Sequence, residues 1–280
     1  MRFFLTGISG FIAKHLAKRL IEEGHDLDVL FYHPEKFGGD ISKLDLRFVD
    51  IGELQRKKYD AVIHLAATTS ISTDFNPDIY YNNIILGAKM LQTPFRTVYA
   101  SSTSVYELVN PYAYSKAFLE HLGEIHGNAL GLRLFNVYGP GNNKGIVKRA
   151  IDCCLSGETL TLQGGDQVRD FIYIDDVVDI IIDHLDNPLS VMDVGTGIGT
   201  RIEDVVKEIT HQMSEFGKGR IPITMISSDL SGEQMESIAH SHPVKEYTPL
   251  REGIRKTIEE TLKQSPKKPE FPADRKSKYY

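Results

Sequence analysis

Residues 2–13 read RFFLTGISGFIA: a short apolar run, a turn containing Gly7 and Gly10, and the beginning of a helical pattern. The apolar run predicts a buried parallel strand. The apolar positions of the helical pattern continue to Gly24, where we expect the helix to end. A strand, a glycine turn and a helix aim backbone N–H groups at a diphosphate. A glycine turn alone is often only a tight turn, but this one opens a βαβ unit, which favours a dinucleotide site.

Further strand candidates follow at residues 27–32, 61–66, 97–101 and 130–135, with helical stretches between them. This alternation predicts an α/β fold with a doubly wound parallel sheet. The strand at 97–101 runs into a series of hydroxyl residues. Hydroxyl groups at the carboxyl end of a parallel strand lie where such sheets bind ligands. A serine-rich turn without function is the alternative.

Tyr112 and Lys116 are four residues apart in a predicted helix at 112–125, so their side chains share one face. An ammonium group there favours the phenolate, and we expect the pKa of Tyr112 to lie below its usual value of about 10. The pair is then suited to proton exchange. The same spacing is common on solvated helices, so this interpretation depends on the glycine turn and the hydroxyl residues.

Together these motifs resemble the extended short-chain dehydrogenase/reductase family, in its nucleotide-sugar epimerase/dehydratase branch. The matching segments are residues 6–12, 64–67, 101–106, 111–116, 132–141, 169–177 and 193–197. The resemblance implies a Rossmann-type sheet with a smaller C-terminal α/β substrate-binding domain. It assigns 1–140 plus 171–195 to the dinucleotide-binding domain, with 171–176 and 191–195 returning to the sheet. It assigns 141–170 plus 196–262 to the substrate domain, and 263–280 reads as a basic, proline-containing tail.

The resemblance also implies the catalytic roles. Tyr112 is the acid/base that acts on a sugar hydroxyl or ketone. Lys116 lowers its pKa and binds the nicotinamide ribose. Ser102 hydrogen-bonds the reacting oxygen, with Thr103 as the alternative.

The expected cofactor contacts are those of NAD, with NADP possible. They are Gly7, Ser9, Gly10, Phe11, Ile12, Asp50, Ile51, Leu65, Ala66, Ala67, Tyr112 and Lys116. Asp50 matches the acid that binds the adenine amino group, with a turn residue as its alternative. His64 reads as a core histidine. No metal site is expected.

Asn136 and Arg169 match the residues that bind the diphosphate of the sugar nucleotide. For Arg169 the alternative is an ion pair with Asp170 or Asp175. We expect Asp175 and Asp176 to cap the helix that follows them.

Three parts of the chain depart from the family pattern: the end of the second strand, the loop after Ser102 and the C-terminal region. Phe31 stands where most NAD-using members carry an acid for the adenosine ribose, and Tyr32, His33 and Lys36 follow, so NADP stays open. Thr103 and Ser104 replace the acid pair of the dehydratases, so we expect no 4,6-dehydratase activity. Residues 230–233 lack the usual arginine, and 239–243 replace a longer helical region. The sugar and the base therefore cannot be carried over from the resemblance.

Composition agrees with a globular protein: of 280 residues, 41% are hydrophobic and 25% charged. The net charge of -6 gives no attraction to nucleic acid or an anionic membrane. We expect no membrane span, no signal peptide and a cytoplasmic location. Cys153 and Cys154 are expected to be free thiols.

Three functions are consistent with these observations. The first is an NAD(P)-dependent nucleotide-sugar epimerase acting at C4 of a UDP- or related NDP-hexose. The second is an NADPH-dependent reductase of a 4-keto-6-deoxy nucleotide sugar. The third is a non-catalytic dinucleotide-binding regulator on the same fold. Since the family commonly dimerises through two helices, here 79–92 and 112–125, we also expect a homodimer.

Overall fold

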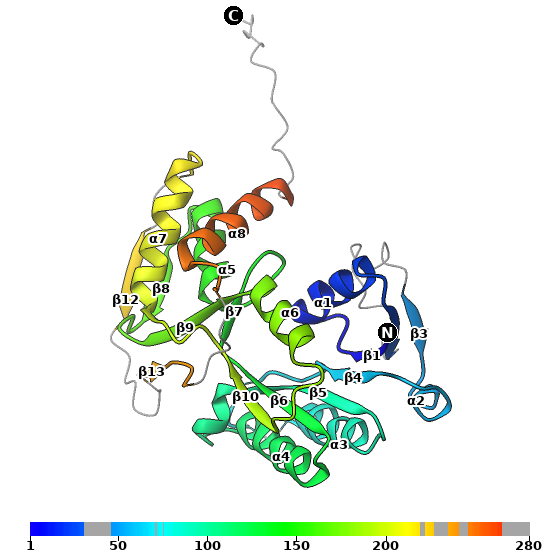
Figure 1. Cartoon of the computed structure of the whole chain (residues 1–280). Coiled ribbons are helices and arrows are strands. Elements are labelled where there is room, and N and C mark those ends of the chain that lie inside the picture. Colours follow the sequence, from blue (N-terminus) through cyan, green and yellow to red (C-terminus); the bar gives the residue numbers. More distant parts are fainter. Residues whose placement is uncertain are drawn as a thin grey trace, which may run out of the picture.

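The computed structural model describes residues 1–30, 46–70, 72–74, 76–218, 222–226, 235–240 and 246–264. Its larger part is built on a seven-stranded parallel sheet with the order β10-β6-β5-β4-β1-β2-β3 (Figure 1). The strands are β1 (Arg2–Thr6), β2 (Asp26–Leu30), β3 (Arg47–Val49), β4 (Ala61–His64), β5 (Arg96–Ser102), β6 (Ala129–Leu134) and β10 (Val191–Val194). The strand order reverses between β1 and β4, which is where such sheets bind ligands. The predicted doubly wound sheet is confirmed.

Helices cover both faces of this sheet (Figure 1). They are α1 (Phe11–Glu22), α2 (Glu53–Arg56), the π-helix η3 (Ile79–Ile85), α3 (Leu86–Leu91), the 3-10 helix η4 (Thr103–Tyr106), α4 (Pro111–His126) and α6 (Ile174–Asp183). α1 and α6 lie on one face, and α3 and α4 lie on the other (Figure 1). In β1, Phe3, Phe4 and Leu5 are all fully buried. Burial of successive residues on both sides is what a central parallel strand requires, and it explains the unbroken apolar run.

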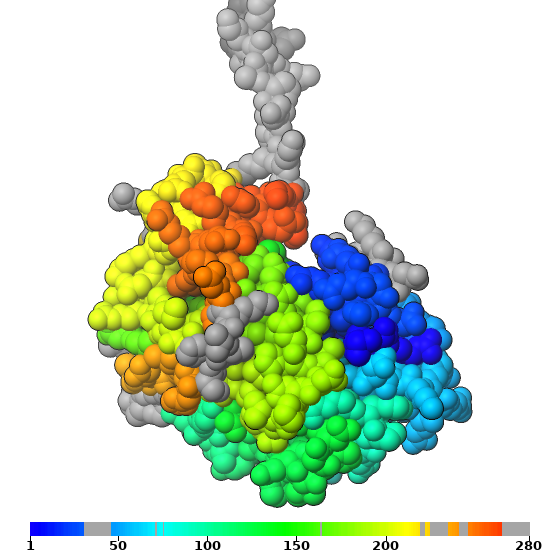
Figure 2. All heavy atoms as spheres, in the orientation of Figure 1, coloured from blue at the N-terminus to red at the C-terminus, as the bar shows by residue number. Residues whose placement is uncertain are grey.

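The smaller part contains two short sheets. One pairs β7 (Asn136–Tyr138), β9 (Val168–Tyr173), β11 (Gly199–Arg201) and β13 (Glu236–Ser237), and the other pairs β8 (Leu160–Gln163) with β12 (Ile223–Ile226). Its helices are α5 (Gly145–Ser156), α7 (Ile202–Glu215) and α8 (Leu250–Gln264). In the space-filling view, α6 lies between the blue α1 and the orange α8 (Figure 2).

The prediction that residues 171–176 return to the main sheet is wrong. The first half of β9 lies between β11 and β13, its second half pairs with β7, and Ile174 already begins α6. The apolar run Phe171–Tyr173 reads as a buried strand in either sheet, so the sequence cannot choose its partner. β10 does join the main sheet, as predicted for 191–195.

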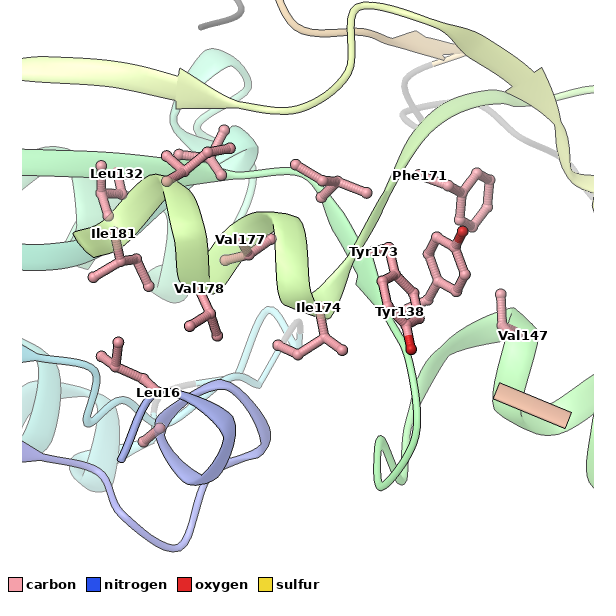
Figure 3. Close-up of a cluster of buried hydrophobic side chains, with 14 of the residues drawn as sticks. Leu16, Leu132, Tyr138, Val147, Phe171, Tyr173, Ile174, Val177, Val178 and Ile181 are labelled. Carbon is pink, nitrogen blue, oxygen red and sulfur yellow. The ribbon is translucent and has the colours of Figure 1, made fainter. Parts of the chain in front are cut away.

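One hydrophobic cluster runs through both parts of the molecule. α6 is its centre: Ile174, Val178 and Ile181 pack between the main sheet with α1 and the aromatic residues of the small sheet (Figure 3). Cys153 and Cys154 are buried in it as free thiols, as predicted. No helix among the described residues is both long enough and apolar enough to cross a membrane.

A buried carboxylate ties β2 to β3. Asp28, 2% exposed, receives hydrogen bonds from the Arg47 guanidinium and, at 2.7 Å, from the Tyr59 hydroxyl, and Lys57 lies 3.6 Å away. Burial opposes ionisation, but the Arg47 and Tyr59 hydrogen bonds and the nearby cations hold the pKa of Asp28 below its usual value. These bonds satisfy a charge that would otherwise be costly to bury.

We therefore expect Asp28→Asn to lower the free energy of unfolding by about 1–3 kcal/mol at pH 7. Because the folded pKa is depressed, this contribution is complete above the unfolded pKa and disappears as pH falls through the folded pKa. Urea denaturation at several pH values measures the difference. Asp26→Asn, an exposed acid on the same strand, is the control. An Asp28→Asn deficit that is constant from pH 7 to pH 2 contradicts the assignment.

Candidate active site

The helix α4 starts where the sequence motif requires it. The Asn110 side chain accepts a hydrogen bond from the Ala113 N–H at 2.9 Å, and Pro111 occupies the first turn. These two residues place Tyr112 in the first turn and Lys116 one turn later. Gly127, with φ of 73°, ends the helix.

Lys116 is a buried ammonium group beside the tyrosine. Its side chain is 2% exposed, and Nζ donates to the Ala100 carbonyl at 2.6 Å and lies 5.7 Å from the Tyr112 ring centroid. Burial lowers the pKa of Lys116 to about 8, and the Glu120 carboxylate acts in the opposite direction. The ammonium is thus held by β5 and directed toward the ring of Tyr112.

The pKa of Tyr112 is raised, not lowered as the spacing predicts. Burial raises it, and a hydrogen bond with the Ser102 side chain lowers it by less. The phenol is desolvated by its surroundings, while the Lys116 ammonium is already bound by a carbonyl. The four-residue spacing places the two groups on one face, but it contains no information about desolvation.

Ser102 is the last residue of β5 and lies directly before the 3-10 helix η4. Its Oγ accepts from the Ser104 N–H at 3.2 Å and contacts the Ser104 hydroxyl at 3.0 Å. This arrangement starts η4 and leaves Ser102 in contact with Tyr112. The structure therefore brings Ser102, Tyr112 and Lys116 together, as the motifs predict.

A cavity of about 610 Å³ lies at the carboxyl ends of β1 and β4, at the strand reversal. The predicted cofactor residues Gly7, Ser9, Gly10, Leu65, Ala66 and Ala67 line it. A second cavity of about 220 Å³ adjoins it, contains the predicted Asp50 and Ile51, and shares Leu30, Tyr81 and Leu86 with the first. Together they are suited to an elongated ligand such as a dinucleotide.

Glycine is required where the turn after β1 meets the end of β4. Gly7 has φ of +82°, and a Cβ there would lie 2.6 Å from the Ala66 nitrogen and 2.7 Å from the Leu65 carbonyl carbon. Gly10 begins α1 without a side-chain cap, so the first N–H groups of that helix are available to a ligand. This arrangement fits a diphosphate, which needs close backbone approach and a helix N-terminus.

Three predicted cofactor residues, Asp50, Phe11 and Ile12, have side chains that make other contacts within the protein. The Asp50 Oδ1 accepts from the N–H groups of Gly52 at 2.6 Å and Glu53 at 3.2 Å, so Asp50 is a turn residue as well as part of the cavity wall. Phe11 stacks edge-on against His15, and Ile12 packs on the main cluster. Their contribution to a cofactor site would be through their backbone.

His64 is a core histidine, as predicted. It is 1% exposed, and its Nδ1 lies 2.7 Å from the Thr6 hydroxyl, which also accepts from the Ala66 N–H at 3.2 Å. Burial lowers the pKa of His64 to about 3, so it is neutral at pH 7. It joins the ends of β1 and β4 below the cavity.

Sequence reasoning missed Asn83, a buried amide in η3. It accepts from the Thr68 N–H at 2.8 Å and donates to the Thr68 carbonyl at 3.1 Å and the Ser115 hydroxyl at 3.0 Å. It therefore connects the cavity wall to the helix of Tyr112. The available signal was an Asn82-Asn83 pair inside an otherwise apolar helical pattern.

Asn136 and Arg169 lie on the paired strands β7 and β9 of the small sheet. Asn136 donates to the Asp170 carbonyl at 3.2 Å, and Arg169 donates to the Val168 carbonyl at 3.0 Å. The Asp170 carboxylate instead accepts from the loop of Thr196, whose N–H lies 2.9 Å and whose hydroxyl lies 2.6 Å away. The Asp170 carboxylate, one of the two ion-pair partners considered for Arg169, thus accepts hydrogen bonds from Thr196.

The capping role expected for Asp175 and Asp176 needs correction. Both are in the first turn of α6, but the N-cap position is Tyr173, whose side chain makes no capping hydrogen bond. Asp176 accepts from Thr248, N–H at 2.9 Å and hydroxyl at 3.0 Å, and so holds the segment before α8. Asp175 lies 4.0 Å from His15.

Some predicted positions lie outside the described residues: Phe31, Tyr32, His33 and Lys36, together with 230–233, 241–243 and 265–280. In the described ranges no cluster of three or more His, Cys, Asp or Glu side chains could hold a metal ion.

Comparison with known proteins identifies a family and several relatives of this chain. A family model described as NAD dependent epimerase/dehydratase family matches residues 3–195. UDP-N-acetyl-alpha-D-glucosaminuronate decarboxylase of Bacillus cytotoxicus is 28% identical, over 76% of this chain and 80% of its own. A probable UDP-glucuronate 4-epimerase of Rhizobium meliloti is 25% identical, over 92% and 96%.

Among solved structures, MoeE5 in complex with UDP-glucose and NAD aligns with a TM-score of 0.77 at 25% identity, covering 94% of this chain and 99% of that one. UDP-glucose 4-epimerase of Thermotoga maritima aligns with a TM-score of 0.74 at 26% identity, with the same coverage. The fold is thus that of proteins solved with a nucleotide sugar.

Proposed function

Because the chain belongs to the NAD dependent epimerase/dehydratase family, we propose that it is a nucleotide-sugar epimerase that inverts C4 of a UDP- or related NDP-hexose. The observation that carries the proposal is the contact of Ser102 with Tyr112 and the proximity of Lys116 to the same ring. A protein that only binds a dinucleotide needs no such paired acid and base. Relatives with 4-epimerase names support the same class of reaction.

NAD, the cofactor of the family, would supply reversible hydride transfer at the sugar carbon. The protein supplies proton transfer and orientation. Tyr112 takes the proton of the sugar C4 hydroxyl and later returns it to the same oxygen, while Ser102 hydrogen-bonds that oxygen. Lys116 contributes positive charge beside the phenol. Burial raises the pKa of Tyr112, and the positive charge of the oxidised cofactor would act to lower it.

We propose that the dinucleotide is bound by the glycine turn, by residues that follow β3 and β4, and by two residues of α4. These residues are Gly7, Ser9, Gly10, Asp50, Ile51, Leu65, Ala66, Ala67, Tyr112 and Lys116. For the sugar nucleotide we propose Asn136 and Arg169, which lie on neighbouring strands. A guanidinium fork suits the charge and geometry of a diphosphate.

The proposal is tested by supplying UDP-glucose and analysing the product, together with the cofactor released when purified protein is denatured. We expect UDP-galactose and co-purified NAD. Formation of a 4-keto-6-deoxy product would contradict it, since Thr103 and Ser104 stand where a dehydratase needs acids. Absence of bound NAD, with NADPH-dependent reduction of a 4-keto-6-deoxy sugar nucleotide, would favour the reductase, which Phe31 in place of a ribose-binding acid supports.

We propose that the protein acts as a homodimer. Tyr114, Phe118 and Ile125 form an exposed apolar row along α4, and η3, which packs against α4, also exposes Tyr80. Soluble monomers rarely leave such a row uncovered. A second copy of the chain would cover it by pairing the two helices with their own symmetry mates.

Phe118→Glu is then expected to convert a dimer into a monomer, because two like charges would face each other across the two-fold axis. Sedimentation at micromolar concentration measures this. Ile198→Glu, at a still more exposed apolar residue outside the row, is the control and should stay dimeric. A parent protein that sediments as a monomer contradicts the homodimer.

A further inference from the structure

A polar network that includes no proposed substrate or cofactor contact fixes α4 against β5. Glu120 lies one turn beyond Lys116 and is almost fully buried. Its carboxylate accepts from the Ser101 hydroxyl and from two nitrogens of Arg133, Nε at 3.0 Å and Nη2 at 2.7 Å. Both carboxylate oxygens are used, which a buried charge requires.

The contacts of β5 with α4 form a series. Three consecutive residues of β5 each form a hydrogen bond with a different residue of α4. The Ala100 carbonyl accepts from Lys116, and the Ser101 hydroxyl donates to Glu120. The Ser102 side chain forms a hydrogen bond with Tyr112. A helix advances only 1.5 Å per residue, so a slip by one residue would break all three contacts together. The helix position relative to the strand is therefore set by this series.

Arg133 also holds the 3-10 helix η4 that follows Ser102. Ser101 and Arg133 are register partners on β5 and β6. Arg133 also donates to the Tyr106 hydroxyl at 3.0 Å, and Tyr106 donates to Asp193 of β10 at 2.6 Å. Tyr106 is the last residue of η4, which Ser102 caps. The Glu120–Arg133 pair thus holds both the helix of Tyr112 and the 3-10 helix after Ser102.

We propose that Glu120, through Arg133 and Ser101, is a positioning residue for the proton-transfer set, because it holds α4 at the register where Tyr112 meets Ser102. The inference rests on the catalytic role proposed for Tyr112. Glu120 contacts neither of the two cofactor cavities. Its loss is therefore expected to lower turnover more than dinucleotide affinity, to which α4 contributes only through Tyr112 and Lys116.

The test compares Glu120→Gln with Glu124→Gln. Both remove one negative charge from α4, but the exposed Glu124 lies one turn further on and makes none of these bonds. In Glu120→Gln an amide N–H₂ would face the Arg133 donors, so the fork is lost. We expect kcat to fall roughly 10–100-fold, the effect of misplacing a reacting group by about 1 Å. The Kd for NAD should rise by a smaller factor than that by which kcat falls, and Glu124→Gln behaves like the parent.

A second measurement does not depend on turnover. With ¹³C-labelled tyrosine, the Cζ resonance of Tyr112, assigned by its absence in Tyr112→Phe, reports the hydrogen bond with Ser102. We expect it to move in Glu120→Gln and not in Glu124→Gln. A protein that lacks epimerase activity but shows this change would refute the proposed reaction and leave the positioning role intact.

Ser101→Ala keeps the proposal testable if Glu120→Gln does not fold, because it removes one hydroxyl and leaves the Glu120–Arg133 pair. It should change the same resonance to a smaller extent. A purely stabilising Glu120 would lower Tm and leave the kcat and the Tyr112 resonance of the folded protein unchanged. That result, in either variant, would overturn the proposal.

Discussion

Tyr112→Phe is expected to lose turnover by roughly 10²–10⁴-fold, the contribution of a positioned general acid/base. The change removes one oxygen from a half-buried side chain whose hydroxyl hydrogen-bonds Ser102. It leaves the ring in place beside the Lys116 ammonium. Substrate binding should therefore stay close to that of the parent, and the loss should appear in kcat.

Steady-state kinetics and calorimetric titration with UDP separate the two effects. Tyr114→Phe is a matched control, because it removes the same atom from the same helix at an exposed position. Its turnover should equal that of the parent. If Tyr112→Phe retains turnover within a few-fold of the parent, Tyr112 is not the acid/base and the epimerase mechanism fails.

Gly7→Ala is expected to have the second large effect, on cofactor retention and on stability. The new Cβ would meet backbone atoms of Leu65 and Ala66 at 2.6–2.9 Å, and backbone atoms cannot rotate away. The turn after β1 and the end of β4 would have to separate. The N–H groups that approach a diphosphate would move with them, so NAD affinity should fall at least about tenfold, or about 1.4 kcal/mol.

Gly24→Ala separates this clash from backbone strain. Gly24 has φ of +77°, close to the +82° of Gly7, but nothing lies within 4 Å of a Cβ there. A positive φ costs a residue other than glycine about 1–2 kcal/mol, and Gly24→Ala should lose only that amount of stability and keep its NAD. Equal losses of stability and NAD in both variants would show that the close approach of β1 and β4 has no special role.

The parts of the fold predicted correctly from the sequence depend on neighbours along the chain. The glycine turn at 7–10 and the five strands predicted up to residue 135 were recognisable from apolar runs and glycines, and β10 from the resemblance. The helix at 79–92 was predicted as one element. The structure divides it into a π-helix and α3, and the wider turn carries the buried amide of Asn83.

The candidate site was predicted to a similar extent. Ser102, Tyr112 and Lys116 were identified by motif, and the structure brings them together. Asn83 and Glu120 were missed, because each acts through partners far away in the sequence. The direction of the Tyr112 pKa shift was wrong for the same reason: it depends on which groups exclude water from the phenol.

By itself the sequence determined the repeating strand and helix pattern, the glycine turn and the candidate residues Ser102, Tyr112 and Lys116, because these follow from residue type, spacing and motif. Only the tertiary structure decided that β9 pairs in the small sheet and that α4 is held against β5 by Glu120. Only it decided that the phenol of Tyr112 is desolvated. Hydrogen-bond partners and desolvation are supplied by distant segments, and no local pattern encodes which segments will meet.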